Sequence, residues 1–312
     1  MSNILVIGSS NTDMVLRVPA LPRAGETVLG SDFAIGGGGK GANQALAAAR
    51  AGGHVSFMAR VGADAFGERA LADLAAAGID TGCCHSDPEA PSGVAQILVD
   101  DAGENCIAVA PGANARLVAA DLDAAASRFA AASIVLLQLE TPLAAVEAAL
   151  ARARDSDCIT LLNPAPAAAL PAACYPLVDI LSPNEHEMAT LTGIAVRDDA
   201  SAGAAADLLH ARGVPTVLIT RGAGGAFLSQ ARAGAAPERA ALPAFPVTAR
   251  DTTAAGDVFN GCLAAALAEG AALPAAVHFA QAGAALAVQT AGAQRSIPER
   301  AAIDALLLAA TP

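Results

Sequence analysis

The sequence has no tryptophan, one tyrosine and a single lysine. Its 18 basic residues are outnumbered by 30 acidic ones, which gives a formal net charge of −12 at pH 7. Binding of a nucleic-acid backbone requires clustered Lys and Arg, so we expect no nucleic-acid partner. The six cysteines include no CxxC pair and the five histidines lie apart from them, so we expect neither a zinc site nor a disulfide framework.

Long apolar runs are also lacking, although 54% of the residues are hydrophobic. Much of that content is alanine, which favours helices but buries little area. The longest uncharged stretch, residues 270–294, contains Pro274, His278 and several glutamines and glycines, so it predicts a helix of a soluble protein and no membrane partner. The chain passes from Met1-Ser-Asn directly into an apolar strand pattern, without the basic segment or cleavage site of an export signal. We therefore expect a cytoplasmic location.

What the chain does contain is an alternation of short apolar segments with helical patterns, such as those at 142–154 and 200–212. The apolar segments are continuous, which is typical of parallel strands buried on both faces of a sheet. Those of the second half are SIVLLQL at 133–139, CITLLN at 158–163, VDILS at 178–182 and TVLIT at 216–220. The sequence therefore predicts one α/β domain over residues 1–312, with a doubly wound, mainly parallel sheet and helices on both faces.

Two stretches, about residues 14–35 and 91–110, do not follow this alternation. They show short patterns in which polar and apolar residues alternate, and the first also contains Pro19, Pro22 and Gly25. We interpret them as small strands outside the main sheet that form a lid.

The single lysine, Lys40, lies in a glycine-rich segment, GGGGKGANQ, that leads into a helical pattern. A glycine turn at the start of a helix lets a ligand approach the backbone closely, and an ammonium group is a more compact charge than a guanidinium. The segment is not a Walker A loop, which would require glycine in place of Ala34 and Ser or Thr in place of Gly41. Retention of one lysine by chance is the alternative interpretation.

The stretch from Asp251 to Gly261, DTTAAGDVFNG, carries a run of small residues into another helical pattern. The backbone N–H groups of Ala255, Gly256 and Asp257 would then be free at a helix N-terminus and would stabilise an anion. A carboxylate beside such an anion site suits phosphoryl transfer to a hydroxyl, because it can accept the proton of the alcohol. The alternative is that Asp257 is an ordinary acidic residue of a first helical turn.

Polar residues and glycines follow several other predicted strands. They are Asn11 and Asp13 after the first strand, Glu140, Asn184 with Glu187, and Thr220 with Gly222 and Gly225. Each has a local explanation as a turn residue, a helix cap or part of a capping box. Because the carboxyl ends of parallel strands meet at one edge of a sheet, their shared position predicts a single site.

Together these motifs resemble those of the ribokinase-like (PfkB) family of sugar kinases, and the resemblance extends over nearly the whole chain. The motifs are GSSNTD, GGKGANQA, VGADAFGE, PGAN, QLETP, NPAPA, PNEHE, TRGAGG, DTTAAGD and GAQRSIP. The resemblance implies an enzyme that uses ATP to phosphorylate a sugar, and it is greatest to members that convert D-ribose to ribose 5-phosphate. Other sugar or nucleoside kinases of the family, such as a deoxyribokinase or a fructokinase, are the nearest alternative. A sugar- or nucleotide-sensing protein without turnover is a more distant one.

The resemblance also implies roles for individual residues. Asp257 would be the general base, with an anion hole formed by Ala254, Ala255, Gly256 and Asp257. The sugar would be held by Asn11, Asp13, Gly39, Lys40, Asn43, Glu140 and Asp257. The nucleotide would be held by Asn184, Thr220, Gly222, Gly225, Gly256 and Gln281. Arg221 stands where an apolar residue is common in the family and could add a phosphate contact.

Two kinds of metal ion follow from the same resemblance. Mg²⁺ would bind with ATP and be organised through water by Glu187. An activating monovalent cation, K⁺ or similar, would be held by a loop beside the anion hole, formed by Asp251, Thr253, Ala287, Thr290, Gly292 and Ser296. The two lid segments would also form the contact of a homodimer.

Overall fold

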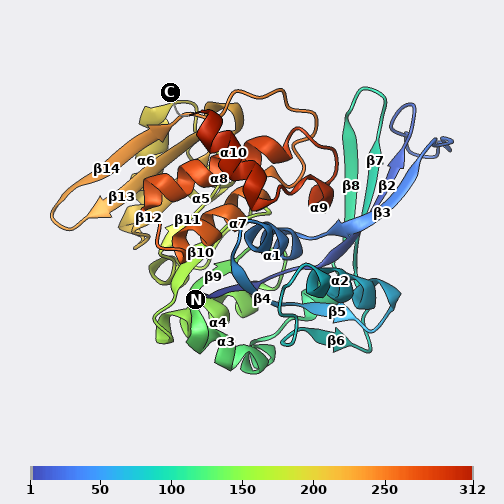
Figure 1. Cartoon of the computed structure of the whole chain (residues 1–312), viewed down its shortest axis with the longest axis horizontal. Coiled ribbons are helices and arrows are strands. Elements are labelled where there is room, and N and C mark those ends of the chain that lie inside the picture. Colours follow the sequence, from blue (N-terminus) through green and yellow to red (C-terminus); the bar gives the residue numbers. More distant parts are fainter. Residues whose placement is uncertain (1–2, 311–312) are drawn as a thin grey trace.

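The computed structural model describes residues 3–310, so the first two and the last two residues of the predicted domain lie outside the described residues (Figure 1). Its large sheet has eight strands in the order β14-β13-β12-β11-β10-β9-β1-β4. They are β1 (Asn3–Ile7), β4 (His54–Met58), β9 (Ala132–Leu137), β10 (Ile159–Leu162), β11 (Ile180–Leu181), β12 (Thr216–Thr220), β13 (Ala226–Arg232) and β14 (Ala235–Leu242). The strands from β12 to β4 are parallel, and β13 and β14 are antiparallel additions at one edge.

The strand order reverses at β1, because the chain adds β4 on one side of it and β9 on the other. In open α/β sheets a ligand crevice forms at such a reversal, outside the carboxyl ends of the strands. The fold therefore provides a place for a site beside the ends of β1 and β9.

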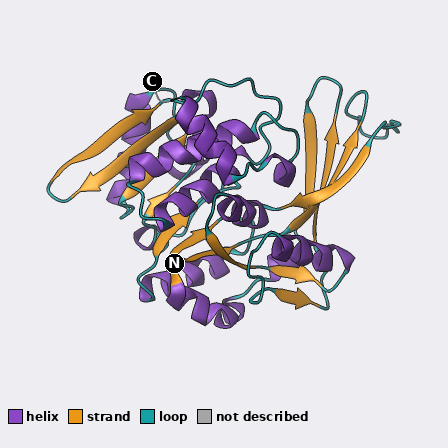
Figure 2. Cartoon of the chain, viewed as in Figure 1, coloured by secondary structure: helices purple, strands orange, loops and turns teal. Residues whose placement is uncertain are grey.

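Helices cover both faces of the large sheet, as the sequence predicted (Figure 2). Within β1, Ile4 and Val6 pack on one face, and Leu5 and Ile7 on the other, because side chains alternate along a strand. The first face is covered by α1 (Lys40–Arg50), α7 (Ala255–Ala268), α8 (Leu273–Ala287) and α10 (Arg300–Ala309). The second is covered by α3 (Ala126–Ala131), α4 (Leu143–Asp155), α5 (Glu185–Thr192) and α6 (Asp199–Ala211).

Helices α1 and α7 pack unusually closely because Gly261 has no side chain. A Cβ at this position would lie 2.5 Å from Cβ of Ala47 and 2.6 Å from the carbonyl oxygen of Gln44. The first turns of the two helices carry the glycine-rich and DTTAAGD segments, so this contact sets how those two segments meet.

A second sheet of four strands, in the order β3-β2-β7-β8, projects beside the end of β1 (Figure 1). Its strands are β2 (Asn11–Arg17), β3 (Phe33–Gly38), β7 (Gly93–Val99) and β8 (Asn105–Ala110). The two predicted lid segments do form one sheet, but the first is wider than predicted. Gly36 to Gly38 are part of β3 and not of a turn, because they pair with Asp13, Thr12 and Asn11.

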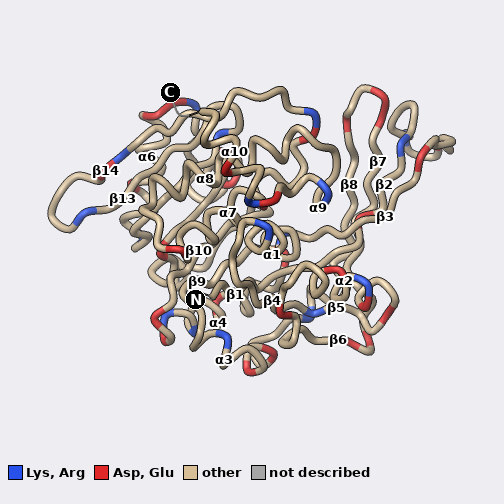
Figure 3. Tube along the Cα trace, in the orientation of Figure 1, with Lys and Arg blue, Asp and Glu red and all other residues tan. Residues whose placement is uncertain are grey.

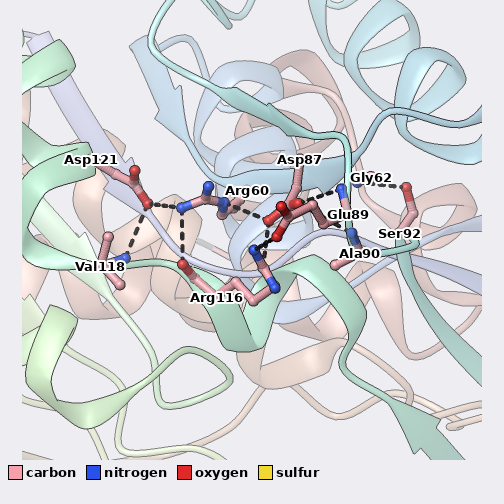
Figure 4. Close-up of polar contacts among 9 residues, drawn as sticks. All are labelled: Arg60, Gly62, Asp87, Glu89, Ala90, Ser92, Arg116, Val118 and Asp121. Carbon is pink, nitrogen blue, oxygen red and sulfur yellow. Dashed lines mark hydrogen bonds and ion pairs between the residues drawn. The ribbon is translucent and has the colours of Figure 1, made fainter.

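An ion-pair network holds the segments that lead into and out of the small sheet (Figure 4). It joins the short strands β5 (Arg60–Gly62) and β6 (His85–Asp87) to the 3-10 turns η1 (Gly112–Arg116) and η2 (Ala119–Ala125). The fully buried carboxylate of Asp87 accepts from Nε of Arg60 at 2.9 Å and from Nε of Arg116 at 2.7 Å. Nη1 of Arg60 also lies 2.8 Å from Asp121.

The remaining differences concern where elements begin. The pattern of residues 122–131 predicts a helix, but the segment starts as the 3-10 turn η2 and becomes α-helical only at Ala126. The pattern of residues 68–77 predicts a helix that starts near Glu68, but α2 (Ala65–Ala76) begins three residues earlier because Asp64 caps it, accepting from the N–H groups of Phe66 and Gly67. Across residues 3–310, none of the helices combines the length and the apolar character needed to cross a bilayer.

Candidate active site

Asp257 lies in the first turn of α7 and only 5% of its surface is exposed. Its Oδ2 accepts from Nδ2 of Asn43 at 3.0 Å, and its Oδ1 accepts from Nε2 of Gln44 at 3.0 Å. Burial raises the pKa of Asp257, and the charge of Lys40 and the two amide hydrogen bonds oppose that rise. A carboxylate buried and held from another helix is not an ordinary first-turn acid, so the alternative interpretation of Asp257 does not fit.

The start of α7 offers donors to an anion. Ala254 has φ 60°, a left-handed conformation, and the helix begins at Ala255. The N–H groups of Gly256 and Asp257 have no partner within the helix, and a Cβ on the exposed Gly256 would meet no atom within 4 Å. The N–H of Ala255 donates to the carbonyl oxygen of Thr252 at 3.2 Å, so the expectation that it is free was wrong.

Lys40 is the first residue of α1 and lies among three carboxylates. Burial alone would lower the pKa of Lys40, but the charges of Asp257, Glu140 and Glu187 raise it above its ordinary value. Figure 3 shows the other basic residues, all arginines, spread over many elements. The single lysine therefore places a positive charge among these carboxylates, and its role in binding stays a prediction.

Glu140 follows β9 and binds the N-terminus of α1. Its Oε2 accepts from Oγ of Ser9 at 2.5 Å and from the backbone N–H of Lys40 at 2.9 Å. It does not cap the next helix, because Pro142 is the N-cap residue of α4 and no side chain bonds to that helix end. The expectation that Pro142 is the first residue of that helix was therefore off by one position.

Asn11 and Asp13 lie in the first residues of β2 and not in a loop. Oδ1 of Asn11 accepts from Nδ2 of Asn114 at 2.7 Å, and Asn114 also bonds to both backbone groups of Ser10. Sequence reasoning did not select Asn114 as a site residue, although it is the last residue of the PGAN motif. It fixes Asn11 at the base of the small sheet.

Asp13 is held in an acidic environment. Burial and the nearby charges of Glu140 and Asp257 raise its pKa to about 6. Gly38 lies against its carboxylate, because a Cβ there would lie 2.1 Å from Oδ1 of Asp13. The glycine that ends β3 thus leaves room for this side chain.

The raised pKa of Asp13 predicts a pH dependence for its expected role of holding the sugar. Below about pH 6 Asp13 is protonated, so one of its two oxygens becomes a donor and it no longer accepts a hydrogen bond at both oxygens. We expect KM for the sugar to rise as the pH falls through about 6, and to be constant above about pH 7. KM measured across this range at saturating ATP checks the prediction, and a KM for the sugar that stays constant down to about pH 5 would contradict it.

Asn184 and Glu187 form the predicted capping box at the start of α5. Oδ1 of Asn184 accepts from the N–H of Glu187 at 2.8 Å, and Oε2 of Glu187 accepts from the N–H of Asn184 at 2.8 Å. Burial raises the pKa of Glu187, while the Asn184 N–H and the charge of Lys40 act against that rise. Both carboxylate oxygens of Glu187 already accept from Asn184, so contact with a metal ion through water fits the donor set better than direct ligation. No group of three or more His, Cys, Asp or Glu side chains suited to a metal occurs within residues 3–310.

Two of the residues expected to hold a nucleotide lie in the turn after β12. Gly222 begins the 3-10 turn η4 (Gly222–Gly224) with φ 51°, and a Cβ there would meet no atom within 4 Å. Thr220 forms an isolated β-bridge with Asn184, which brings the end of β12 next to the start of α5. Gly225 has φ 82°, and a Cβ there would lie 2.0 Å from the carbonyl oxygen of Leu242. The backbone around Leu242 therefore occupies the space where a side chain at this position would lie.

Two residues of this region are held by other parts of the protein. Nη1 of Arg221 lies 2.5 Å from Asp199, and its guanidinium stacks over the ring of Phe227, so the additional phosphate contact expected of it stays a prediction. Gln281 on α8 is 7% exposed and donates to the carbonyl oxygen of Leu242 at 3.0 Å. Its side chain holds the end of β14.

The residues expected to bind a monovalent cation come from two loops that Asp251 joins. Its Oδ1 accepts from the N–H of Thr253 at 2.9 Å, and its Oδ2 accepts from the N–H of Gly292 at 2.8 Å. Thr290 bonds back to Ala287 at the end of α8, and Ser296 ends the short helix α9 (Ala293–Ser296). The carboxylate thus brings the two predicted halves of the loop together.

Sequence reasoning missed three buried amides behind Asp257: Gln44, Gln138 and Asn163. Each belongs to a motif that was recognised, namely GGKGANQA, QLETP and NPAPA, but no pattern within one motif shows that the three side chains meet.

Comparison with known proteins places the whole chain in a family. Residues 1–300 match the model of the pfkB family of carbohydrate kinases. A curated ribokinase of Haemophilus influenzae is 42% identical over 297 residues, which cover 95% of this chain and 95% of that protein. A deoxyribokinase of Salmonella typhi is 36% identical over 299 residues, again 95% of each. The crystal structure of an Arabidopsis thaliana ribokinase complexed with ribose and ATP matches with a TM-score of 0.90 at 30% identity, covering 98% of this chain and 99% of that one.

Proposed function

Because this chain belongs to the pfkB family of carbohydrate kinases, we propose that it transfers the γ-phosphoryl group of ATP to O5 of D-ribose, giving ribose 5-phosphate and ADP. The observation that carries the proposal is the buried carboxylate of Asp257 beside the N–H groups at the start of α7. The name of the 42% identical relative and the ribose and ATP of the Arabidopsis complex support ribose as the substrate.

In the proposed reaction Asp257 accepts the proton of the 5-hydroxyl as O5 forms its bond to the γ-phosphorus and the bond to the ADP oxygen breaks. The N–H groups of the anion hole, Ala254 to Asp257, stabilise charge on the transferring group, with Gly256 and Asp257 as the direct donors. Phosphoryl transfer needs positioning and charge stabilisation more than covalent chemistry, and this arrangement supplies both.

The sugar site that we propose consists of Asn11, Asp13, Gly39, Lys40, Asn43 and Glu140, with Asp257. Asp13 and Glu140 offer acceptors to ring hydroxyls, and Asn11 offers an amide fixed by Asn114. Lys40 supplies the positive charge that offsets the surrounding carboxylates. The small sheet that carries Asn11 and Asp13 acts as a lid over the bound sugar and excludes water from the transfer.

The nucleotide site that we propose consists of Asn184, Thr220, Gly222, Gly225, Gly256 and Gln281. The open space above Gly222 and Gly256 supports close approach of phosphates to the backbone. Gln281 acts in this proposal through the end of β14 that it holds.

Two cations belong to the proposal. Mg²⁺ bound with ATP supplies charge that offsets the negative charge of the phosphates, and Glu187 orients its water ligands. K⁺ or a similar ion binds the loop of Asp251, Thr253, Ala287, Thr290, Gly292 and Ser296, and so fixes the residues that precede the anion hole.

We further propose a homodimer that forms through the small sheet. Its exposed apolar side chains support this contact, since Phe33 and Ile35 on β3 and Ile107 and Val109 on β8 are each between 47% and 60% exposed. A cytoplasmic location fits the use of ATP and the free thiols of all six cysteines.

A coupled assay of ADP formation with a panel of sugars, each with and without K⁺, tests the reaction, the substrate and the cation together. We expect the highest kcat/KM with D-ribose and a higher rate with K⁺ than without it. Strong activity with another sugar and negligible activity with ribose would overturn the choice of substrate.

Deoxyribose is the second candidate substrate, because a deoxyribokinase is 36% identical to the chain. The two sugars differ by the 2-hydroxyl, and a site with a hydrogen-bonding group for a hydroxyl discriminates strongly against the sugar that lacks it. The fixed amide of Asn11 favours ribose, and the ratio of kcat/KM for the two sugars decides between them.

A further inference from the structure

We propose that Gln44 is a positioning residue for phosphoryl transfer. A series of hydrogen-bonded buried amides, which begins at a backbone carbonyl, holds the side-chain NH₂ group of Gln44 toward Asp257. The inference rests on the proposed function, in which Asp257 is the base. It concerns residues that do not touch the substrate and act through Asp257.

The chain starts at the carbonyl oxygen of Ser182, just past the end of β11. This oxygen can only accept a hydrogen bond, and Nδ2 of Asn163 donates to it at 2.9 Å. The other end of that amide, Oδ1 of Asn163, must therefore face Gln44, and it accepts from Nε2 of Gln44 at 3.1 Å. The backbone thus determines which end of Asn163 meets Gln44.

Gln44 is consequently oriented with its NH₂ group toward the site. Nε2 has two hydrogens, and besides Asn163 it donates to Oδ1 of Asp257 at 3.0 Å. On its other side, Oε1 of Gln44 accepts from Nε2 of Gln138 at 2.6 Å. An exchange of the oxygen and nitrogen of Gln44 would break all three bonds and would place an oxygen against the carboxylate.

The chain is enclosed on every side. Gln44 and Gln138 are 0% and 1% exposed, and Asn163 is 6% exposed. Oε1 of Gln138 has no partner and lies against Gly8, where a Cβ would be 2.0 Å from it. A buried amide oxygen without a partner costs free energy. Gln138 nevertheless keeps the orientation in which its Nε2 donates to Gln44, and this orientation keeps the NH₂ group of Gln44 toward Asp257.

The two amide donors favour the ionised, fixed form of the base, against the effect of its surroundings. The charged groups facing Asp257 are Lys40 on α1, Glu140 after β9, Glu187 on α5 and Asp13 on β2. Three of the four are acidic and oppose a further negative charge. The amides of Asn43 and Gln44 each donate to one oxygen of the carboxylate, which fixes its plane and leaves lone pairs for the sugar hydroxyl.

The test is Gln44→Met, which keeps the length of the side chain and removes the amide. A hydrogen bond to a charged group predicts a fall in kcat of about 10- to 100-fold, with KM for ribose changed by less than about threefold, since Gln44 does not touch the sugar in this proposal. The acidic limb of the pH profile of kcat should move to higher pH, because the ionised base loses a donor. Asn163→Leu should move the limb in the same direction by a smaller amount, since it frees Gln44 to turn.

Thr160→Val is the matched control. Thr160 lies at the other end of β10 from Asn163, is fully buried and donates to the carbonyl oxygen of Leu177 at 2.7 Å. This variant also loses buried hydrogen bonds from the same strand, to Leu177 and Asp179, so it should lose stability without any movement of the acidic limb.

A second readout does not depend on turnover. The pKa of the Asp257 carboxyl can be followed by NMR in protein with ¹³C-labelled aspartate, assigned with Asp257→Asn, and it should be higher in Gln44→Met and in Asn163→Leu than in the unsubstituted protein. An unchanged carboxyl pKa in both variants overturns the proposal. Absence of kinase activity in the unsubstituted protein would instead overturn the proposed function and leave the carboxyl titration to decide this inference.

Discussion

Replacement of Asp257 by asparagine is expected to lower kcat by about 10²- to 10⁴-fold, the contribution of a positioned general base. Asparagine has nearly the same shape but cannot accept the proton of the 5-hydroxyl. Its amide would also direct hydrogens at the donors of Asn43 or Gln44, which now bond to the carboxylate. Steady-state kinetics with ribose and ATP measure the loss, and KM for both substrates should change much less than kcat.

Asp73→Asn provides the comparison for this variant. Asp73 lies on α2, its side chain is 66% exposed, and it forms an ion pair with Arg69 one helical turn away. Exposed pairs of this kind contribute about 0–1 kcal/mol, so the control should keep its activity. Turnover by Asp257→Asn at the unsubstituted rate would remove Asp257 from the mechanism as its base.

The second large effect is expected at Gly41, in the first turn of α1. A Cβ on Gly41 would lie 2.5 Å from the backbone N of Ser9 and 2.6 Å from the carbonyl carbon of Gly8. Neither atom is at the end of a flexible side chain, so Gly41→Ala must move α1 away from the end of β1. We expect the free energy of unfolding to fall by about 1–3 kcal/mol.

Activity should fall further than stability in this variant, because α1 carries Lys40, Asn43 and Gln44. A displacement of about 1 Å of such groups costs about 10²-fold in rate, and we expect kcat/KM to fall by about that factor. Denaturant unfolding and kinetics of the same preparation check both quantities.

Gly36→Ala is the control for this substitution, because a Cβ at Gly36 would meet no atom within 4 Å. It should alter stability by no more than about 0.5 kcal/mol. Gly41→Ala with unchanged activity would show that the close contact between α1 and β1 is not needed to place the site.

Local patterns were sufficient for much of the fold. The continuous apolar runs identified the parallel strands, because both faces of β1 and its neighbours are covered by helices. The capping box of Asn184 and Glu187 was read correctly from its spacing, since both partners lie within one turn. The helix start at Ala255 was visible for the same reason.

Patterns within one segment failed where a distant segment decided the outcome. Gly36 to Gly38 have the composition of a turn, but pairing with β2 makes them a strand. Arg221 stands next to a glycine turn, and no local pattern shows that Asp199 on α6 holds its guanidinium. In both cases the partner lies more than 20 residues away and its position depends on the folded chain.

By itself, then, the sequence determined the α/β class and the residue types gathered at the strand ends, because these depend on composition and short-range periodicity, and its motifs indicated the family by resemblance. Only the tertiary structure decided how those residues act on one another: that Asp257 is buried and held by two amides, that the pKa of Asp13 rises to about 6, and that Gln138 and Asn163 fix Gln44. Burial, hydrogen-bond direction and the sum of nearby charges depend on distances between side chains far apart in the chain, and those distances exist only in the fold.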